Sequence, residues 1–264
     1  MSNRLPEDWD KRIVGIGGSG IVSLYCPTTV LKGYVVVFDG RVTNWFEIKE
    51  PQKRSLELEH QAYERLGPHR NILRCLGWVQ VQEDARSLRL EYASKGCLRS
   101  FIETNASRPV EMPLRLTWAI DLAAGQAHMH SKKVYHCDFS CRNVLLTEEN
   151  VVKIGDFGGA GLDERESDGV EECRYDLPLR GRNWEDRPYY KRDLFALGSS
   201  IYEIMAWKKP FAELDDWEVE NRFARDEFPD VSNIACAHVI RKCWEEKYDR
   251  AEDVMDELRA RQTN

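Results

Sequence analysis

The sequence has little of several features that mark common functional classes. Its eight cysteines are scattered and never form a Cys-x-x-Cys pair, which argues against a zinc ribbon and favours small buried thiols in a reducing compartment. No apolar run approaches the length of a bilayer span, and residues 1–8 lack the apolar core of a signal peptide. The net charge of −7 indicates neither nucleic acid nor an anionic membrane as a partner. We therefore expect a cytoplasmic or nuclear protein without a membrane span.

The hydrophobic pattern changes character near residue 94. The chain has 264 residues, 42% of them hydrophobic, which is enough for one large or two small lobes. Before residue 94, short β-branched and aromatic runs predict strands over 13–24, 29–32, 34–38, 41–48, 73–81 and 87–92, with one helix over 55–66. After it, the pattern predicts helices over 97–103, 114–131, 193–205, 216–224, 234–246 and 250–261, a hairpin over 144–154 and a polar stretch without regular structure over 161–192. We expect an α+β fold in a single domain, 1–264, with a β-rich lobe over 1–93, a helical lobe over 94–264 and a ligand cleft between them.

Two polar motifs flank the predicted hairpin. Residues 136–143 read H-x-D-x-x-x-x-N, and residues 156–158 read D-F-G. The hairpin carries Asn143 at its start and Asp156 at its end, so both should lie with Asp138 at one edge of an apolar platform. Phosphoryl transfer from a nucleotide needs an acidic group beside the incoming hydroxyl and oxygen ligands for Mg²⁺. Asp138 can supply the first, and Asn143 and Asp156 the second.

A glycine-rich turn lies near the N-terminus. Gly15, Gly17 and Gly20 match G-x-G-x-x-G, and the branched Val22 follows. In a dinucleotide-binding fold this motif would run into a helix, but here β-branched residues follow. The sequence therefore favours a glycine-rich lid between two antiparallel strands, whose backbone N–H groups can approach phosphate oxygens. A plain hairpin turn is the alternative.

These motifs, in this order, resemble the eukaryotic protein kinase domain across nearly the whole chain. The same family pattern includes residues 90–98, similar to the strand and hinge that hold adenine, residues 193–198, similar to D-x-x-x-x-G, and a C-W…R ending at Cys243, Trp244 and Arg250. The local sequences, including residues 29–32, are similar to those of a little-studied fungal group of kinase-domain proteins near the tyrosine-kinase-like branch. The resemblance implies ATP and Mg²⁺ as cofactors and a protein substrate, with serine or threonine favoured over tyrosine as acceptor. It does not indicate an oligomeric state.

The resemblance assigns roles to individual residues. Lys32 would contact the α- and β-phosphates and Glu59 would pair with it, Asp138 would be the catalytic base, and Asn143 and Asp156 would bind Mg²⁺. The expected ATP-binding residues are Gly15, Gly17 and Gly20 in the turn, Val22, Val30 and Leu145 around adenine, Leu90 as gatekeeper, and Glu91 and Ala93 in the hinge. The expected apolar column between the lobes contains Tyr63, Cys75, His136 and Phe157.

Two assignments have rivals in the sequence. Lys32 follows an unusually short hairpin, and the Asp39-Gly40 turn lengthens its separation from Glu59, so Lys49 at the end of another strand is the alternative lysine. On the helix over 55–66, Glu57 and Glu64 compete with Glu59, which fits best by its distance to Leu66. Either lysine can also be a solvated strand-end charge, and a glutamate-rich surface helix is the plain alternative for all three acids.

The chain departs from the kinase pattern in the region that usually regulates activity. Cys137 stands where many members have an Arg that meets phosphate on the activation loop, so we expect no need for loop phosphorylation and near-neutral effects of Ser167→Ala and Tyr175→Phe. Cys137 and Cys141 are expected to pack rather than react. An Ala-Pro-Glu sequence is missing, which leaves Glu185 as the substitute partner for Arg250.

Three functions fit this sequence. An active ATP-dependent protein kinase is favoured because each core polar role has a candidate. A pseudokinase that serves as a nucleotide-binding scaffold or interaction module is the alternative, supported by the missing Ala-Pro-Glu and the irregular lysine spacing. A kinase-fold enzyme acting on a small-molecule hydroxyl or amine is the third. Ser140 and Arg142, in the loop after Asp138, leave the acceptor open because the first departs from serine/threonine kinases and the second resembles tyrosine kinases.

Overall fold

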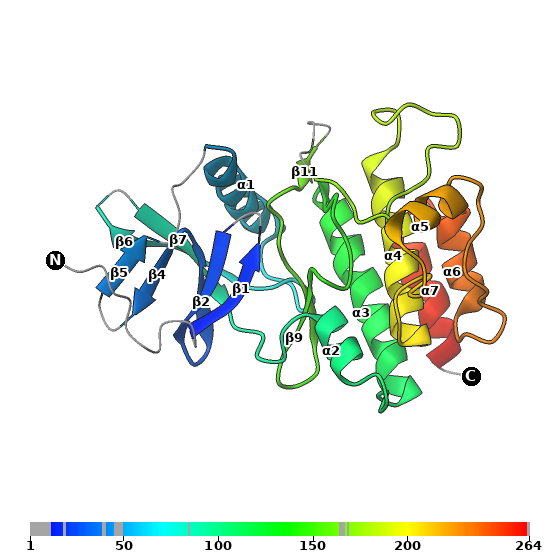
Figure 1. Ribbon diagram of the computed structural model, residues 1–264, viewed down its shortest axis with the longest axis horizontal. Coiled ribbons are helices and arrows are strands. Elements are labelled where there is room, and N and C mark those ends of the chain that lie inside the picture. The colour runs from blue at the N-terminus through cyan, green and yellow to red at the C-terminus, as the bar shows by residue number, and fades with distance from the viewer. Residues whose placement is uncertain are drawn as a thin grey trace.

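The chain folds into a β-rich N-terminal region and a helical C-terminal region, joined by a short segment over residues 92–97 that contains a turn (Figure 1). This computed structural model describes residues 12–17, 20–38, 41–44, 50–83, 85–163, 167 and 169–262. The mixed composition of the two regions confirms the predicted α+β class. In the described part of the chain, no helix is both long enough and apolar enough to cross a membrane.

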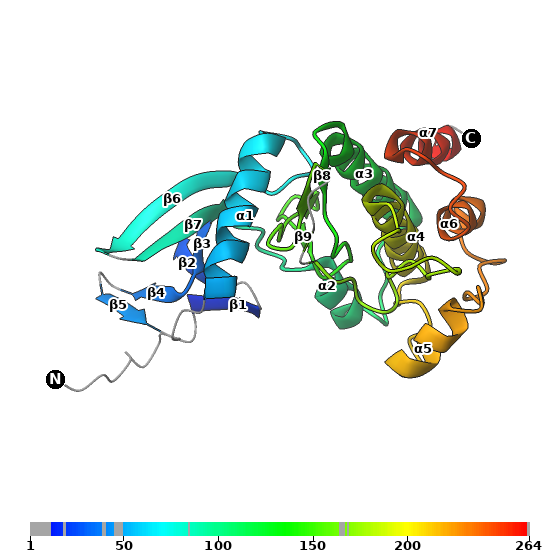
Figure 2. The same cartoon turned by 90° about the horizontal axis from the view of Figure 1, so that it is seen from above.

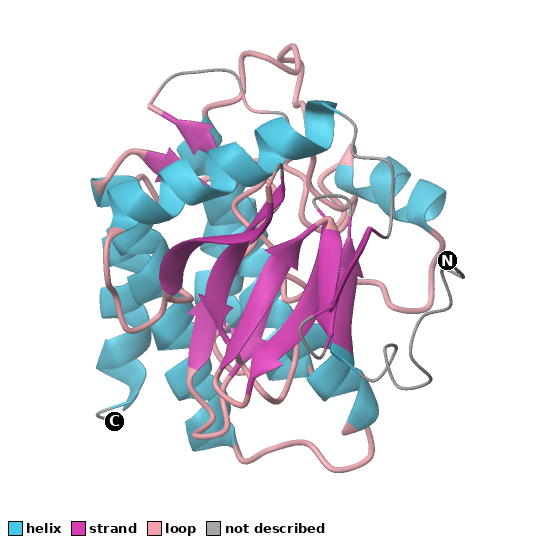
Figure 3. Cartoon of the chain, turned by 90° about the vertical axis from the view of Figure 1, so that its left-hand side faces the viewer, coloured by secondary structure: helices cyan, strands magenta, loops and turns pink. Residues whose placement is uncertain are grey.

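The N-terminal region is built on a five-stranded antiparallel sheet (Figure 3). Its order is β1 (Ile13–Gly17), β2 (Gly20–Cys26), β3 (Thr29–Gly33), β7 (Ala85–Glu91) and β6 (Cys75–Gln82). Gly17 pairs with Gly20 across the β1–β2 turn, so the glycine motif joins two antiparallel strands as predicted. Gly20 has φ +132°, and a Cβ there would lie 2.5 Å from the Gly33 carbonyl oxygen, so this position requires glycine.

A second hairpin and one helix complete the N-terminal region. Strands β4 (Val35–Phe38) and β5 (Arg41–Asn44) pair separately from the large sheet, while the Asp39-Gly40 turn and residues 45–49 lie outside the described residues. Helix α1 (Glu50–Leu66) packs against the sheet (Figure 2). The prediction started this helix five residues late, because Pro51 reads as a breaker although proline fits the first turn of a helix.

The C-terminal region packs around two long helices, α3 (Met112–Ser131) and α4 (Tyr189–Ala206). Helix α7 (Ala251–Gln262) lies against α3, and α6 (Ala237–Trp244) lies against α4 (Figure 2). Helices α2 (Leu98–Thr104) and α5 (Asp216–Phe223) complete the helical set. Trp118, Phe195 and Trp244 are fully buried in this core. Most residues of α4 are buried on all sides of the helix, which is typical of a helix in the centre of a core.

Two small antiparallel ladders lie between the regions. Strands β9 (Val144–Leu146) and β10 (Val152–Ile154) form the predicted hairpin. Strands β8 (Val134–Tyr135) and β11 (Gly161–Leu162) also pair, so the stretch expected to lack regular structure begins with a strand. A two-residue strand is too short for its alternation to register in the sequence. The same stretch also ends early, since α4 begins at Tyr189 directly after Pro188, four residues before the predicted start.

Candidate functional site

A buried lysine joins the two regions at the centre of the candidate site. Lys32 on β3 is 5% exposed, and its Nζ lies 2.6 Å from Oε2 of Glu59 on α1 and 2.7 Å from Oδ1 of Asp156 after β10. Burial lowers the pKa of Lys32, but the two carboxylates outweigh it and raise the pKa above its ordinary value, so the ammonium stays charged. The structure therefore brings together three residues that lie far apart in the sequence, in the arrangement expected of a phosphate-contacting lysine.

The rival residues lie elsewhere or outside the described chain. Glu57 forms an ion pair with Arg86, and both side chains are partly exposed. The Glu64 carboxylate lies 3.5 Å from the ring of His60 on its own helix. Glu59 is instead fully buried, which fits its pairing with Lys32 rather than a surface role. Lys49 lies outside the described residues.

The buried carboxylate of Asp193 fixes the backbone of the loop that carries Asp138. Asp193 of α4 accepts hydrogen bonds from the backbone N–H groups of His136 at 2.8 Å and Cys137 at 3.1 Å, and its Oδ2 lies 3.0 Å from Nε2 of His130. Burial raises the pKa of Asp193, but the neighbouring histidines and these bonds hold it below its ordinary value. The carboxylate thus remains ionised and holds Cys137 in a left-handed conformation with φ 60°.

The Asp138 carboxylate faces two donors from its own loop. Asn143 Nδ2 donates to Oδ2 at 3.0 Å and to the Asp138 carbonyl at 2.8 Å. Arg142 Nη2 reaches Oδ1 at 3.3 Å and Oδ2 at 3.2 Å. A carboxylate offers about four lone-pair sites, so these contacts leave one site on Oδ1 for an incoming hydroxyl. Burial raises the pKa of Asp138, which suits a group that accepts a proton.

The β9–β10 hairpin positions the two candidate Mg²⁺ ligands. Asn143 directly precedes β9, Asp156 follows β10, and the Gly155 N–H donates to the Asn143 carbonyl at 2.9 Å. Because Asn143 uses its amide nitrogen on Asp138, its amide oxygen is the atom left for a cation. An amide oxygen and a carboxylate are the oxygen ligands that Mg²⁺ accepts, so these residues fit the ion.

The residues expected around adenine lie at the junction of the two regions. Val30, Leu90 and Ala93 are buried, and Val22 and Leu145 are half-buried. The Glu91 carboxylate lies 3.0 Å from Lys153 Nζ and accepts from the Arg74 N–H at 3.2 Å. Glu91 would therefore offer a ligand its backbone rather than its side chain.

An apolar column connects the lobes behind the site. The ring of Phe157 lies 5.0 Å from Tyr63 in an edge-on contact and 5.2 Å from His136. Cys75 is partly buried against the same core. Phe157 is fully buried, so Asp156 beside it is held with its carboxylate on Lys32. Packing of this kind fixes the position of the D-F-G turn.

The described part of the activation segment, residues 159–163, 167 and 169–188, approaches Cys137 closely at Gly169. A Cβ at Gly169 would lie 2.8 Å from the Cys137 Cβ and 2.7 Å from its carbonyl oxygen. Burial raises the pKa of the Cys137 thiol to about 12, and that of Cys141 well above its ordinary value, so both pack as inert side chains. The Ser167 hydroxyl donates to the Gly159 carbonyl at 2.5 Å and accepts from the Gly169 N–H at 3.0 Å.

The expected pairing of Arg250 with Glu185 is wrong. Arg250 pairs with Asp253 three residues later in the chain, and Glu185 is exposed. The activation segment instead supplies the cation: Arg182 forms two bonds with the Glu246 carboxylate, at 2.8 Å each. The charges of this contact are thus the reverse of the predicted ones: the cation lies on the activation segment, and its carboxylate partner follows α6.

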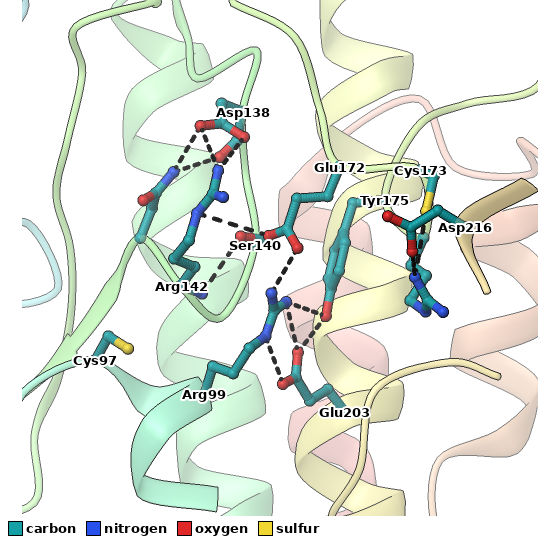
Figure 4. A network of polar contacts seen from close by, with 12 residues as sticks. Cys97, Arg99, Asp138, Ser140, Arg142, Glu172, Cys173, Tyr175, Glu203 and Asp216 are labelled. Atoms are coloured by element: carbon teal, nitrogen blue, oxygen red, sulfur yellow. Dashed lines mark hydrogen bonds and ion pairs between the residues drawn. The ribbon is translucent and has the colours of Figure 1, made fainter. Parts of the chain in front are cut away.

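A second network, missed from the sequence, centres on Arg99 of α2 (Figure 4). Its guanidinium contacts Glu172 at 2.6 Å, Glu203 of α4 at 3.1 Å and the Tyr175 hydroxyl at 2.7 Å. Tyr175 is fully buried, and its hydroxyl also donates to Glu203. Arg142 Nε lies 3.8 Å from the far oxygen of Glu172, which extends the network to the catalytic loop. Separations of 28 to 104 residues gave no local signal for these contacts.

Comparison with known proteins places the chain in a family. Residues 46–256 match the model of protein tyrosine and serine/threonine kinases. A probable serine/threonine-protein kinase of Dictyostelium discoideum is 29% identical over 196 residues, 69% of this chain and 36% of that protein. A tyrosine-protein kinase receptor of Caenorhabditis elegans is 31% identical over 220 residues, 77% of this chain and 19% of the receptor. The mouse megakaryocyte-associated tyrosine-protein kinase is 29% identical over 185 residues, 67% of this chain and 35% of that protein.

These matches cover part of this chain and a smaller part of each relative. The chain spans about a third of the length of two of these relatives and less of the third. The family match begins after Lys32 and the glycine turn, so the geometry around Lys32 is what links those residues to the rest of the site. Fold, motif order and family match agree, and the chain belongs to the protein tyrosine and serine/threonine kinase family.

Proposed function

We propose that this chain is an ATP- and Mg²⁺-dependent protein kinase that transfers the γ-phosphoryl group to a protein hydroxyl, with serine or threonine favoured over tyrosine. The observation that carries the proposal is the double contact of the Lys32 ammonium, 2.6 Å from Glu59 and 2.7 Å from Asp156. A lysine held between these carboxylates is oriented to receive phosphate oxygens, and its full charge matches theirs.

Each residue of the site has a defined task in this mechanism. Lys32 binds phosphate oxygens, and Glu59 orients its ammonium. Asn143 and Asp156 would hold Mg²⁺, which neutralises phosphate charge when bound. Asp138 offers the free site on Oδ1 to the acceptor hydroxyl, orients it and takes up its proton. The backbone of the glycine turn at Gly15, Gly17 and Gly20 and the side chains of Val22, Val30, Leu90, Ala93 and Leu145, with the Glu91 backbone, would bind the nucleotide.

The alternative function is that of a pseudokinase used as a nucleotide-binding scaffold. Arg142 contacts both oxygens of Asp138, and Cys137 replaces a cation, so the same fold could hold a nucleotide without transferring phosphate. Four further features are predictions. They are a single domain over 1–264, kinship with a fungal group of kinases, a preference for serine or threonine, and a cytoplasmic or nuclear location. The named relatives include both serine/threonine and tyrosine kinases, so the acceptor is decided by experiment.

The test combines binding with turnover. Purified protein is incubated with Mg²⁺ and radiolabelled ATP on a mixed serine, threonine and tyrosine peptide library, next to the Asp138→Asn variant. A kinase labels peptides in an Asp138-dependent manner, and the residue labelled identifies the acceptor. In parallel, millimolar Mg²⁺-ATP should raise the melting temperature by mass action, and Asp156→Ala should remove the Mg²⁺-dependent part. A thermal shift without labelling identifies the pseudokinase, and the absence of both refutes nucleotide binding.

A further inference from the structure

Arg142 lies between two carboxylates that compete for it. Its Nη2 reaches both oxygens of Asp138, at 3.2 and 3.3 Å, while its Nε lies 3.8 Å from Oε1 of Glu172. The Arg142 side chain is 52% exposed, so packing does not fix its position. The balance between the two acidic partners must therefore decide where its guanidinium lies.

Glu172 is itself held firmly. Its other oxygen lies 2.6 Å from Arg99 Nη1, and Arg99 is anchored by Glu203 on the buried helix α4. Burial raises the pKa of Glu172, but Arg99 outweighs this effect and, with Ser140 and Arg142 beside it, lowers the pKa below its ordinary value. Glu172 is thus a fixed negative charge, and the mobile partner in the series Glu203, Arg99, Glu172, Arg142 and Asp138 is Arg142 (Figure 4).

We propose that Glu172 is a positioning residue for Asp138: it shares Arg142 with that carboxylate and so keeps one lone-pair site of Oδ1 open to the acceptor hydroxyl. This inference rests on the proposed kinase function. An arginine and a carboxylate prefer two parallel hydrogen bonds, one to each oxygen, with N···O distances near ~2.8 Å. The contacts here are longer, and a single nitrogen makes both of them.

The consequence of removing the Glu172 charge follows from this geometry. Without it, Arg142 is free to turn and place a second nitrogen on Oδ1 of Asp138. That bond fills the site which the acceptor hydroxyl needs, and the guanidinium brings a full positive charge to the carboxylate that a neutral hydroxyl lacks. Transfer should slow, while the ion pairs of Lys32 with Glu59 and Asp156 in the nucleotide site should stay in place.

The experiment is a double-mutant cycle on the purified chain. In Glu172→Gln, kcat for peptide phosphorylation should fall about 10-fold or more, a part of the roughly 10²–10⁴-fold that a positioned base contributes, and the KM for ATP should stay within about twofold. Adding Arg142→Gln should restore kcat to the level of Arg142→Gln alone, because the competing cation is gone. Asp176→Asn is the matched control: it removes another activation-segment carboxylate, paired with Arg187 at 2.8 Å, and should leave both constants near the wild type.

Two further measurements separate positioning from folding. The Gln amide oxygen can still accept from Arg99, so Glu172→Gln should melt close to the wild type. Glu172→Asp keeps the charge and should retain most of kcat. If Glu172→Gln does not fold, the neutral Glu172→Met variant takes its place in the cycle. A crystal structure of Glu172→Gln should show Arg142 bonded to Asp138 through two nitrogens.

The outcomes distinguish the inference from the function on which it rests. If Glu172→Gln keeps the wild-type kcat, or loses it without rescue by Arg142→Gln, Glu172 does no more than tie the activation segment to Arg99 and the inference is wrong. If the wild type shows no Asp138-dependent transfer at all, the proposed function fails first and the inference fails with it.

Discussion

Replacing Tyr175 with Phe removes one hydroxyl from a buried polar cluster of the activation segment. The side chain is fully buried, its hydroxyl donates to Glu203, and Arg99 Nη2 donates to that hydroxyl at 2.7 Å. Burial raises the pKa of Tyr175, so the hydroxyl keeps its proton and remains a donor to the Glu203 carboxylate. The expectation that Tyr175→Phe is near neutral concerns activity and stays a prediction, whereas the burial of the side chain adds an expected loss of stability.

The size of the effect follows from which contacts survive. A hydrogen bond to a charged group contributes about 1.5–3 kcal/mol, and two such bonds are lost. Arg99 still reaches Glu203 directly, at 3.1 Å through Nε and 3.3 Å through Nη2, so the buried carboxylate keeps its main partner. We therefore expect a loss of about 2 kcal/mol in the free energy of unfolding, which lowers the melting temperature by about 4–8 °C for a chain of this size.

Urea denaturation and thermal melting of the purified variant measure this loss. Tyr25→Phe is the control, because Tyr25 is 42% exposed and keeps its ring beneath Arg89 after substitution. The control should change the free energy of unfolding by less than about 0.5 kcal/mol. A Tyr175→Phe variant as stable as the control would refute the reasoning, because it would mean that the buried hydroxyl contributes nothing to the Arg99 network.

Two other predictions concern turnover and regulation. Lys32→Met should abolish most phosphoryl transfer while Lys49→Met changes it little, because one ammonium occupies the place beside Glu59; equal losses in the two steady-state rates would contradict the assignment. Phosphatase-treated protein should keep its activity, and Ser167→Ala should lower the free energy of unfolding by about 1 kcal/mol through its lost bonds to the Gly159 carbonyl and the Gly169 N–H. A large loss of activity on dephosphorylation, restored by rephosphorylating Ser167, would show that another basic group replaces the missing Arg.

The sequence predicts the centre of the site because the chemistry of phosphoryl transfer restricts which residue types can stand there and at what spacing. Asp138, Asn143 and Asp156 lie within 18 positions, and a short hairpin connects them, so their spacing alone brings them to one edge. The glycine turn was predicted for a similar reason, since Gly17 and Gly20 face each other across two residues. Lys32 is harder to assign from the sequence, because a hairpin separates it from Glu59. Its ion pair with Glu59 in the folded chain identifies it.

The regions that escaped prediction depend on contacts between distant segments. Strands β8 and β11 have two residues each and form because they pair with each other, so no local sequence pattern predicts them. The reversed pair of Arg182 and Glu246 joins residues 64 positions apart, and the composition of either segment is compatible with many partners. Tertiary context therefore decides which charges meet, whereas the sequence shows only that they are present.

The arrangement around Cys137 connects the unusual loop residue with the unusual activation segment. Gly169 lies so close that a Cβ there would come within 2.8 Å of the Cys137 Cβ, so the small thiol and the glycine are fitted to each other. The segment that follows is held by charges of the protein itself: Glu171 meets Arg192 at 2.6 Å, with both side chains buried. An arginine at position 137 would need the space that this closed segment fills. Phosphate would have to enter beside Glu171 and add about two negative charges there. We therefore expect the two departures to explain each other: a segment tied down by buried ion pairs should need no phosphate to order it, and a loop that meets no phosphate should need no arginine.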